Sequence, residues 1–309
     1  MLSICLVGHK GYWGPKLLRN LEKNSRIKVT ALVDMQAGEE EREEKSLKDA
    51  LAMRDFDAVV IATPPETHYS VAKEALLAGK HVLVEKPLTT TLKDAQALVR
   101  LAAEKNLKLG VDHTFLFSSH IRQLRKLIQA GKIGDILHVV SRRLNFGKFQ
   151  LSGVIWDLAP HDLAVMDYLF GSDFQVSAVV SGTHLQNDVV DTATIHIEYK
   201  TGMTYGLDLS WLNPKKDRTT TVVGTNGMIE YDMLSDSPLI IYDKAIVGID
   251  RDMAHRYSWM SIYEGEVKEP LALLVDEFAD WILLDKPFVS PGSLGMRVVG
   301  DIEDILKKC

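Results

Sequence analysis

The first third of the chain alternates continuous apolar runs with amphipathic stretches. Residues 2–7 form a continuous apolar run, as expected of a strand buried on both faces of a parallel sheet. Further strands are expected at residues 29–33, 58–62, 82–84 and 107–111. The amphipathic stretches predict helices at residues 15–23, 47–53, 69–78 and 92–103. Strands and helices in this order predict right-handed crossovers and a doubly wound sheet.

The hydrophobic pattern changes after about residue 120. Residues 191–199 and 203–211 alternate apolar and polar positions on either side of a turn, which predicts an antiparallel hairpin. A second hairpin is expected from residues 219–223 and 228–231, and helices are expected at residues 158–169, 271–284 and 296–307. The fold class is therefore α/β, with a doubly wound parallel sheet in a domain at residues 1–118 and an α+β domain at residues 119–309. A C-terminal helix could pack back on the first domain.

Composition and charge narrow the class of protein. The chain is 46% hydrophobic and 25% charged, which is typical of a folded protein. A net charge of −6 gives no positive field for nucleic acid or an anionic membrane, and no apolar run reaches the roughly 18 residues of a membrane span. Cys5 and Cys309 cannot form a disulfide framework, and the first residues enter a strand without room for a signal peptide, so a cytoplasmic location is expected. The acidic run at residues 39–44 predicts a solvated helix face.

A glycine-rich turn follows the first strand. Gly8, Gly11 and Gly14 give the spacing GxxGxxG between a strand and a helix, and Asp34 ends the second strand 20 positions after Gly14. Backbone N–H groups at the helix start can hold a pyrophosphate, and Asp34 can accept from ribose hydroxyls. The carboxylate, with no Arg directly after it, favours NAD over NADP. The residues assigned to the coenzyme in this region are Gly8, Gly11, Tyr12, Trp13, Gly14 and Asp34. The alternative is a turn that binds nothing.

The loop after the third predicted strand also lies where ligands bind in such sheets. Thr63, Pro64, Thr67 and His68 are assigned to the coenzyme site. Thr67 has an alternative role as a helix N-cap. For His68 a structural role is favoured over a catalytic one.

The triplet Glu85-Lys86-Pro87 follows the fourth predicted strand. Lys86 at this edge can donate to a substrate oxygen next to a nicotinamide and stabilise developing negative charge, whereas the plainer alternative is a surface lysine. Glu85 and Lys86 are also assigned to the coenzyme site. His113, after the fifth strand, either lines the substrate cleft or packs at the domain junction.

Asp157 and His161 are four residues apart and share a face if the segment is helical. A lysine, a carboxylate and an imidazole near a nicotinamide are the groups that move a proton and a hydride between a carbinol and a carbonyl. The alternatives are that Asp157 is a helix N-cap and that His161 is a core histidine. With only Asp162 as a further ligand, no metal site is expected.

These motifs resemble the Gfo/Idh/MocA family of NAD(P)-dependent oxidoreductases, named for glucose–fructose oxidoreductase, inositol dehydrogenase and a rhizopine-catabolism protein. The likeness covers most of the chain and is carried by the segments Gly11-Tyr-Trp-Gly14, Ala62-Thr-Pro-Pro-Glu-Thr-His68, Glu85-Lys86-Pro87 and Trp156-Asp-Leu-Ala-Pro-His-Asp162. The chain departs from the family pattern by one extra residue in the glycine turn.

The resemblance implies specific roles. Lys86 looks like the lysine that contacts the reacting oxygen, His161 like the general acid/base, and Asp157 like the carboxylate that orients the histidine or the substrate. The substrate residues that it suggests, besides His113, are Arg143, Asn145 and Trp211. Arg143 could bind a carboxylate or phosphate, or only keep a strand edge soluble, and Trp211 could merely pack. The resemblance also implies that residues 1–118 form an NAD-binding Rossmann domain. It implies that residues 119–309 contain a large, mostly antiparallel, open-faced sheet through which homodimers or homotetramers form.

The function expected is hydride transfer between NAD and a secondary hydroxyl or keto group of a sugar, sugar derivative or nucleotide sugar. Two alternatives stay open: a glycosidase that uses NAD for transient oxidation, and a non-catalytic dinucleotide-binding regulator. A regulator would not need Lys86, Asp157 and His161 together.

Overall fold

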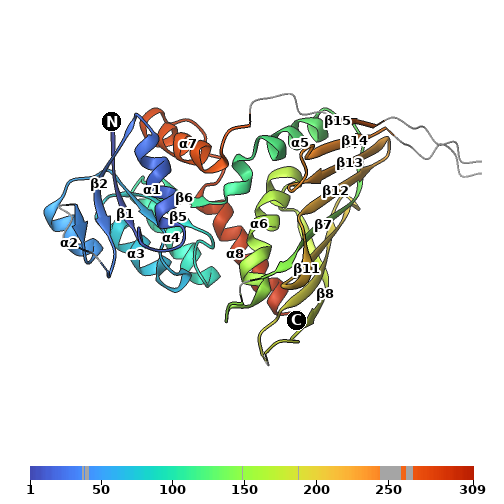
Figure 1. Ribbon diagram of the computed structural model, residues 1–309, viewed down its shortest axis with the longest axis horizontal. Coiled ribbons are helices and arrows are strands. Elements are labelled where there is room, and N and C mark those ends of the chain that lie inside the picture. Colours follow the sequence, from blue (N-terminus) through green and yellow to red (C-terminus); the bar gives the residue numbers. More distant parts are fainter. Residues whose placement is uncertain (37, 39–41, 148, 187, 244–258, 262–266) are drawn as a thin grey trace, which may run out of the picture. The chain divides into compact units, whose positions relative to one another are not determined.

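The computed structural model describes residues 1–309 except 37, 39–41, 148, 187, 244–258 and 262–266 (Figure 1). The chain forms two compact units. The first comprises Met1–Phe117 and Lys268–Gly300, and the second comprises Ser118–Val267 and Asp301–Cys309. The assignment of separate functional domains to residues 1–118 and 119–309 stays a prediction.

The first unit is built on a six-stranded parallel sheet with the order β3-β2-β1-β4-β5-β6. Its strands are β1 (Leu2–Val7), β2 (Ile27–Val33), β3 (Glu43–Glu44), β4 (Ala58–Ile61), β5 (His81–Glu85) and β6 (Leu109–Asp112). The order reverses at β1, which lies between β2 and β4, so this is the topological switch point at which such sheets bind ligands. The predicted doubly wound sheet is confirmed.

The helices of this unit are α1 (Gly14–Lys23), α2 (Leu47–Met53), α3 (Pro65–Leu77), α4 (Leu92–Glu104) and α7 (Pro270–Leu284), with a 3₁₀ turn at Thr114–Phe117. Ile4, Cys5 and Leu6 in β1 are fully buried, as are nearly all atoms of β4. This explains the unbroken apolar runs, since helices cover both faces of a parallel sheet.

The acidic run ends in a strand and not in a helix. Glu43 and Glu44 form the short edge strand β3, opposite Leu32 and Val33 of β2. The expected helix face is therefore wrong for these two residues, and residues 39–41 lie outside the described part. The Glu43 carboxylate is only 7% exposed because it bonds to His9 Nε2 at 2.8 Å and to Lys10 Nζ. Charged edge strands of this kind resist pairing with other chains.

The second unit contains a nine-stranded sheet of order β15-β14-β13-β12-β7-β10-β9-β8, and β11 pairs with β7. Its strands are β7 (Ile136–Phe146), β8 (Phe174–Gly182), β9 (Thr192–Tyr199), β10 (Thr204–Ser210), β11 (Leu212–Asp217), β12 (Thr219–Gly224), β13 (Gly227–Asp232), β14 (Leu239–Tyr242) and β15 (Trp259–Ser261). The pairing is antiparallel except between β7 and β10. Both predicted hairpins, β9–β10 and β12–β13, are confirmed.

One face of this sheet packs against α6 (Gly153–Phe170). Along β9, Ile195 and Ile197 are buried while His196 and Glu198 are exposed, so the strand has one core face and one polar face. The helix α5 (Ser119–Gln129) of this unit was not among the predicted helices. The helix α8 (Gly292–Leu306), which begins in the first unit and ends in the second, confirms the last predicted helix. Within the described residues, none of the helices is long and apolar enough to span a membrane.

Candidate active site

The glycine turn lies between β1 and α1 and allows no larger side chain at two positions. Gly8 has φ +86°, and a Cβ there would lie 2.7 Å from the Ala62 carbonyl oxygen. A Cβ on Gly14 would lie 2.3 Å from the Gly8 carbonyl oxygen. The Gly11 N–H donates to that same oxygen at 3.1 Å. The turn is thus closed upon itself and upon the loop after β4, and the extra residue is accommodated without opening it.

A cavity of about 480 Å³ lies against this turn, at the carboxyl ends of β1, β2 and β4. Six of the predicted coenzyme residues line it, namely Gly8, Gly11, Asp34, Thr63, Pro64 and Thr67. Glycine-turn residues Tyr12 and Trp13 do not line it. Tyr12 is 77% exposed, and Lys16 Nζ lies 3.8 Å from its ring centre and 4.1 Å from that of Trp13.

Asp34 is held by backbone groups on two sides. Its Oδ2 accepts from the Lys10 N–H at 3.1 Å and its Oδ1 from the Gln36 N–H at 3.0 Å. Lys10 also lines the cavity, and its Nζ donates to the Gln36 carbonyl at 2.6 Å and pairs with Glu43. The pKa of Glu43 is lowered to about 2, mainly by the hydrogen bond from the Gly38 N–H and to a smaller extent by those from His9 and Lys10. Sequence reasoning missed Lys10 and Glu43, because only the fold brings them together.

His68 lies within hydrogen-bond distance of two loops, the one after β4 and the one after β5. It is fully buried, its Nδ1 lies 2.7 Å from the Pro87 carbonyl oxygen, and its Nε2 lies 2.9 Å from that of Thr63. These contacts support the structural role favoured for it. Thr67 is not a helix N-cap, because α3 begins at Pro65 with Pro64 as its N-cap, and the Thr67 hydroxyl lies 2.7 Å from the Pro64 carbonyl oxygen. Proline is favoured at the first helical position, and the sequence pattern placed this start too late.

Lys86 follows β5 at the same carboxyl edge and is partly exposed. Glu85 before it is buried, and its carboxyl group is hydrogen-bonded to that of Asp112 at the end of β6. His113 is also buried, which together with the positive charge of Lys86 lowers its pKa to about 3. Lys86 therefore has three buried titratable neighbours, of which Asp112 was missed by the sequence reasoning.

Asp157 and His161 lie one turn apart inside α6, both half-buried. The helix begins at Gly153 after Ser152, so Asp157 is not its N-cap. The indole Nε1–H of Trp211 donates to Asp157 Oδ2 at 3.1 Å, and the Trp211 ring packs against Phe149. Trp211 therefore packs and also orients a predicted catalytic carboxylate.

The other predicted substrate residues of the second unit are held by charged neighbours. Arg143 forms a buried ion pair with Asp162. The carboxylates of Asp162 and Asp157 both act on the guanidinium of Arg218. Since Arg143 is buried on a strand paired on both sides, the alternative of strand-edge solubility is wrong. Asn145 Oδ1 accepts from Arg218 Nη2. Burial, followed by the charge of Arg143, lowers the pKa of Arg218.

Lys86 belongs to the first unit, and Asp157 and His161 belong to the second, so their meeting at one substrate stays a prediction. Among the described residues, no three His, Cys, Asp or Glu side chains gather as metal ligands.

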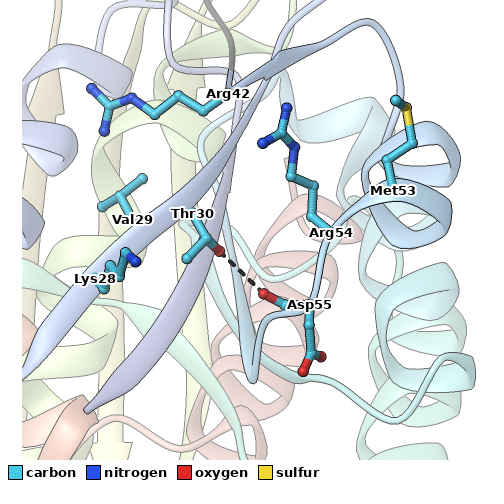
Figure 2. A pocket seen from close by; sticks show the side chains of 7 residues that line it. All are labelled: Lys28, Val29, Thr30, Arg42, Met53, Arg54 and Asp55. Atoms are coloured by element: carbon cyan, nitrogen blue, oxygen red, sulfur yellow. Dashed lines mark hydrogen bonds between the residues drawn. The ribbon is translucent and has the colours of Figure 1, made fainter.

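A second hollow of the first unit is a groove of about 690 Å³ (Figure 2). Its lining comes from the first half of β2, the end of α2 and the segment before β3, and Thr30 Oγ1 bonds to the Asp55 carbonyl at 3.4 Å. Arg42 pairs with Glu22 at 2.9 Å and Arg54 with Glu44 at 3.2 Å. The groove is not at the carboxyl ends of the strands, where ligands of this fold class bind, and we assign no coenzyme to it.

Comparison with known proteins agrees with this fold. Residues 2–113 match the family model described as an oxidoreductase family with an NAD-binding Rossmann fold, and residues 121–230 match the GFO/IDH/MocA C-terminal domain. The first match confirms the expected coenzyme class, NAD. The structure of GenD2 from gentamicin A biosynthesis, in complex with NAD, is similar in fold, with a TM-score of 0.83 at 22% identity over 99% of this chain and 93% of that one.

The chain is 30% identical to a UDP-N-acetylglucosamine 3-dehydrogenase from Acidithiobacillus ferrooxidans, over 81% of this chain and 78% of that protein. A crystal form of that enzyme matches with a TM-score of 0.81 at 25% identity, over 98% of this chain and 96% of that one. An uncharacterised oxidoreductase from Schizosaccharomyces pombe is 34% identical, but the match covers only 43% of this chain and 38% of that protein.

Proposed function

This chain belongs to the Gfo/Idh/MocA family of oxidoreductases that act on CH–OH groups, and we propose that its substrate is a sugar, a sugar derivative or a nucleotide sugar. The observation that carries the proposal is the pair on α6. Asp157 and His161 share one face of a helix, and Trp211 fixes the carboxylate at 3.1 Å. A carboxylate beside an imidazole is suited to take up and return the proton of a hydroxyl group.

The residues at the cavity of the first unit fit NAD. The positions of Gly8 and Gly14 have no space for a Cβ, as expected where a backbone approaches a pyrophosphate closely. Asp34, fixed by two backbone N–H groups, would accept from the ribose hydroxyls. Lys10 and Lys45 both line this cavity. The charge of Lys10 is matched by Glu43 at 3.2 Å, which favours NAD over NADP.

Bound NAD supplies the hydride acceptor. His161 removes the proton of the substrate hydroxyl, and Asp157 orients its imidazole. Lys86 donates to the reacting oxygen and stabilises the negative charge that develops on it. In the reverse direction His161 returns the proton to the same oxygen. The remaining residues assigned to the coenzyme site lie next to the cavity and hold its edges in place. They are Tyr12 and Trp13 in the glycine turn, His68 in α3, and Glu85 at the end of β5.

The substrate region that we propose is the polar group of α6, β7 and the segment after β10. The similarity to a UDP-N-acetylglucosamine 3-dehydrogenase supports a nucleotide sugar as the first class to test. Asn145 and Trp211 belong to this group together with Arg143, whose charge is already matched by Asp162. His113, the other residue predicted to line the substrate cleft, is buried at the sheet edge of the first unit.

We further propose a homodimer or homotetramer formed through the polar face of the nine-stranded sheet, where His196 and Glu198 are exposed. We also propose a cytoplasmic location, because the thiols of Cys5 and Cys309 are free, as is usual in a reducing compartment.

The test is NADH formation by the wild-type protein on a panel of free sugars, inositols, uronates and nucleotide sugars, followed by near-ultraviolet absorbance. Turnover confined to one class supports the proposal and identifies the substrate class. Tight NAD binding without turnover on any member would contradict it. Hydrolysis of aryl glycosides without net NADH would then indicate the glycosidase alternative.

A further inference from the structure

Two carboxyl groups meet beside Lys86 at the carboxyl edge of the first sheet. Glu85 is the last residue of β5 and Asp112 the last of β6, and the register places them directly opposite each other. Glu85 is 6% exposed and Asp112 is 1% exposed. Their side chains are hydrogen-bonded to each other. Glu85 Oε1 and Asp112 Oδ2 are buried without a hydrogen-bond donor from the part of the chain that the structure describes.

A hydrogen bond between two carboxyl groups needs a proton on one of them. Two buried carboxylates in contact cannot both be ionised, so one proton is retained by the pair. Burial raises the pKa of both groups, most strongly that of Glu85. The Thr114 hydroxyl donates to Asp112 Oδ1 at 2.6 Å, which places the negative charge on Asp112 and the proton on Glu85. The pair therefore carries one negative charge.

The positive charge of Lys86 acts on both carboxyl groups and opposes their protonation. His113 adds no second positive charge. The Ser290 hydroxyl donates to the Val111 carbonyl at 2.7 Å, so at 3.0 Å it accepts the proton of His113 Nδ1. Burial, together with the charge of Lys86, lowers the pKa of His113 to about 3, so the imidazole is neutral and its lone pair is on Nε2. The four titratable groups at this sheet edge, Glu85, Lys86, Asp112 and His113, therefore carry one negative charge on the carboxyl pair and one positive charge on Lys86.

We propose that Glu85 and Asp112 form a carboxyl pair that shares one proton, and that its single negative charge is the fixed counter-charge of the Lys86 ammonium. The two residues are positioning residues: they act through Lys86 by holding it protonated at the sheet edge. The catalytic use of Lys86 rests on the proposed function, whereas the charge state of the pair does not.

The experiment compares Glu85→Gln, Asp112→Asn and the double variant, all isosteric with the native side chains. Acylation of Lys86 by acetic anhydride is followed against pH by peptide mass spectrometry, in the protein without coenzyme or substrate. Each single variant retains one carboxylate, so its acylation midpoint stays with the wild type. The double variant loses the charge, and its midpoint falls by about 1–3 pH units, the range for removal of a close opposite charge.

If the acylation midpoint falls in each single variant and the two shifts add up to that of the double variant, both carboxyl groups are ionised in the wild type. That result would overturn the claim that they share one proton. An unshifted double variant would overturn the counter-charge. Infrared spectroscopy gives a second readout if the double variant does not fold. The wild type at neutral pH is expected to show the C=O band of a protonated carboxyl group that Glu85→Gln lacks, and a wild type without that band contradicts the proposal. Since no turnover is measured, an inactive enzyme would count against the proposed function alone.

Discussion

The buried ion pair of Arg143 and Asp162 gives a quantitative prediction for the second unit. Their side chains are 10% and 4% exposed, and Ser141 Oγ donates to Asp162 Oδ1 at 2.7 Å. Asp162→Asn keeps the size of the side chain and an acceptor for Ser141 but removes the charge. Breaking a buried ion pair from one side costs about 3–5 kcal/mol of stability, because the remaining charge is left buried. The nearby guanidinium of Arg218 places the expected loss toward the upper part of that range.

The assay is urea unfolding followed by tryptophan fluorescence, with the free energy taken from the transition that involves the second unit. The matched control is Asp208→Asn. Asp208 pairs at 3.7 Å with Arg142, which is the neighbour of Arg143 on β7, and the side chains of Asp208 and Arg142 are 34% and 51% exposed. That exposed pair is worth at most about 1 kcal/mol. The double change Arg143→Met with Asp162→Asn is expected to recover part of the loss. Equal losses for Asp162→Asn and Asp208→Asn would refute the reasoning.

Three further predictions concern single groups. Trp211→Phe removes the N–H that holds Asp157 and is expected to lower kcat/KM about 10-fold or more, since a hydrogen bond to a charged group is worth about 1.5–3 kcal/mol; an unchanged kcat/KM would contradict it. In the folded protein one thiol, Cys309, is expected to react with a thiol reagent at neutral pH, because burial raises the pKa of Cys5 to about 12, and two should react after unfolding. Glu43, with a folded pKa of about 2 against an ordinary 4.5, stabilises the fold above pH 4.5 and loses that contribution as the pH falls toward 2; a carboxyl NMR titration with its midpoint near 4.5 would contradict this.

The elements of this fold could be predicted because their hydrophobic periods are unambiguous. Residues 58–61 of β4 and residues 82–84 of β5 have no polar position to allow a helix surface, and the alternation around Gly202 specifies a hairpin. The sequence pattern predicts a start of α3 that is too late, because two consecutive prolines are typical of a loop, whereas here the second proline opens the helix.

The polar partners that the sequence does not predict share one physical cause, which is charge matched across long sequence separations. The Glu43 carboxylate lies 2.8 Å from Nε2 of His9, which is 34 positions away. Arg143 is buried because Asp162 on another element neutralises it. Asp112 has meaning only through the register that sets it opposite Glu85. Local periodicity contains no information on such partners, whereas the glycine turn, Asp34 and the α6 pair belong to local motifs, so their roles could be predicted from the sequence.

The central claim is that Lys86 and His161 carry out proton and hydride chemistry on a carbinol at bound NAD. The most direct measurement compares NADH formation and NAD affinity for the wild type, Lys86→Ala and His161→Gln, on the substrate that the panel identifies. We expect turnover to fall by about 10²-fold or more in both variants, the contribution typical of a positioned acid–base group, while NAD still binds to each. Undiminished turnover in His161→Gln would contradict the account.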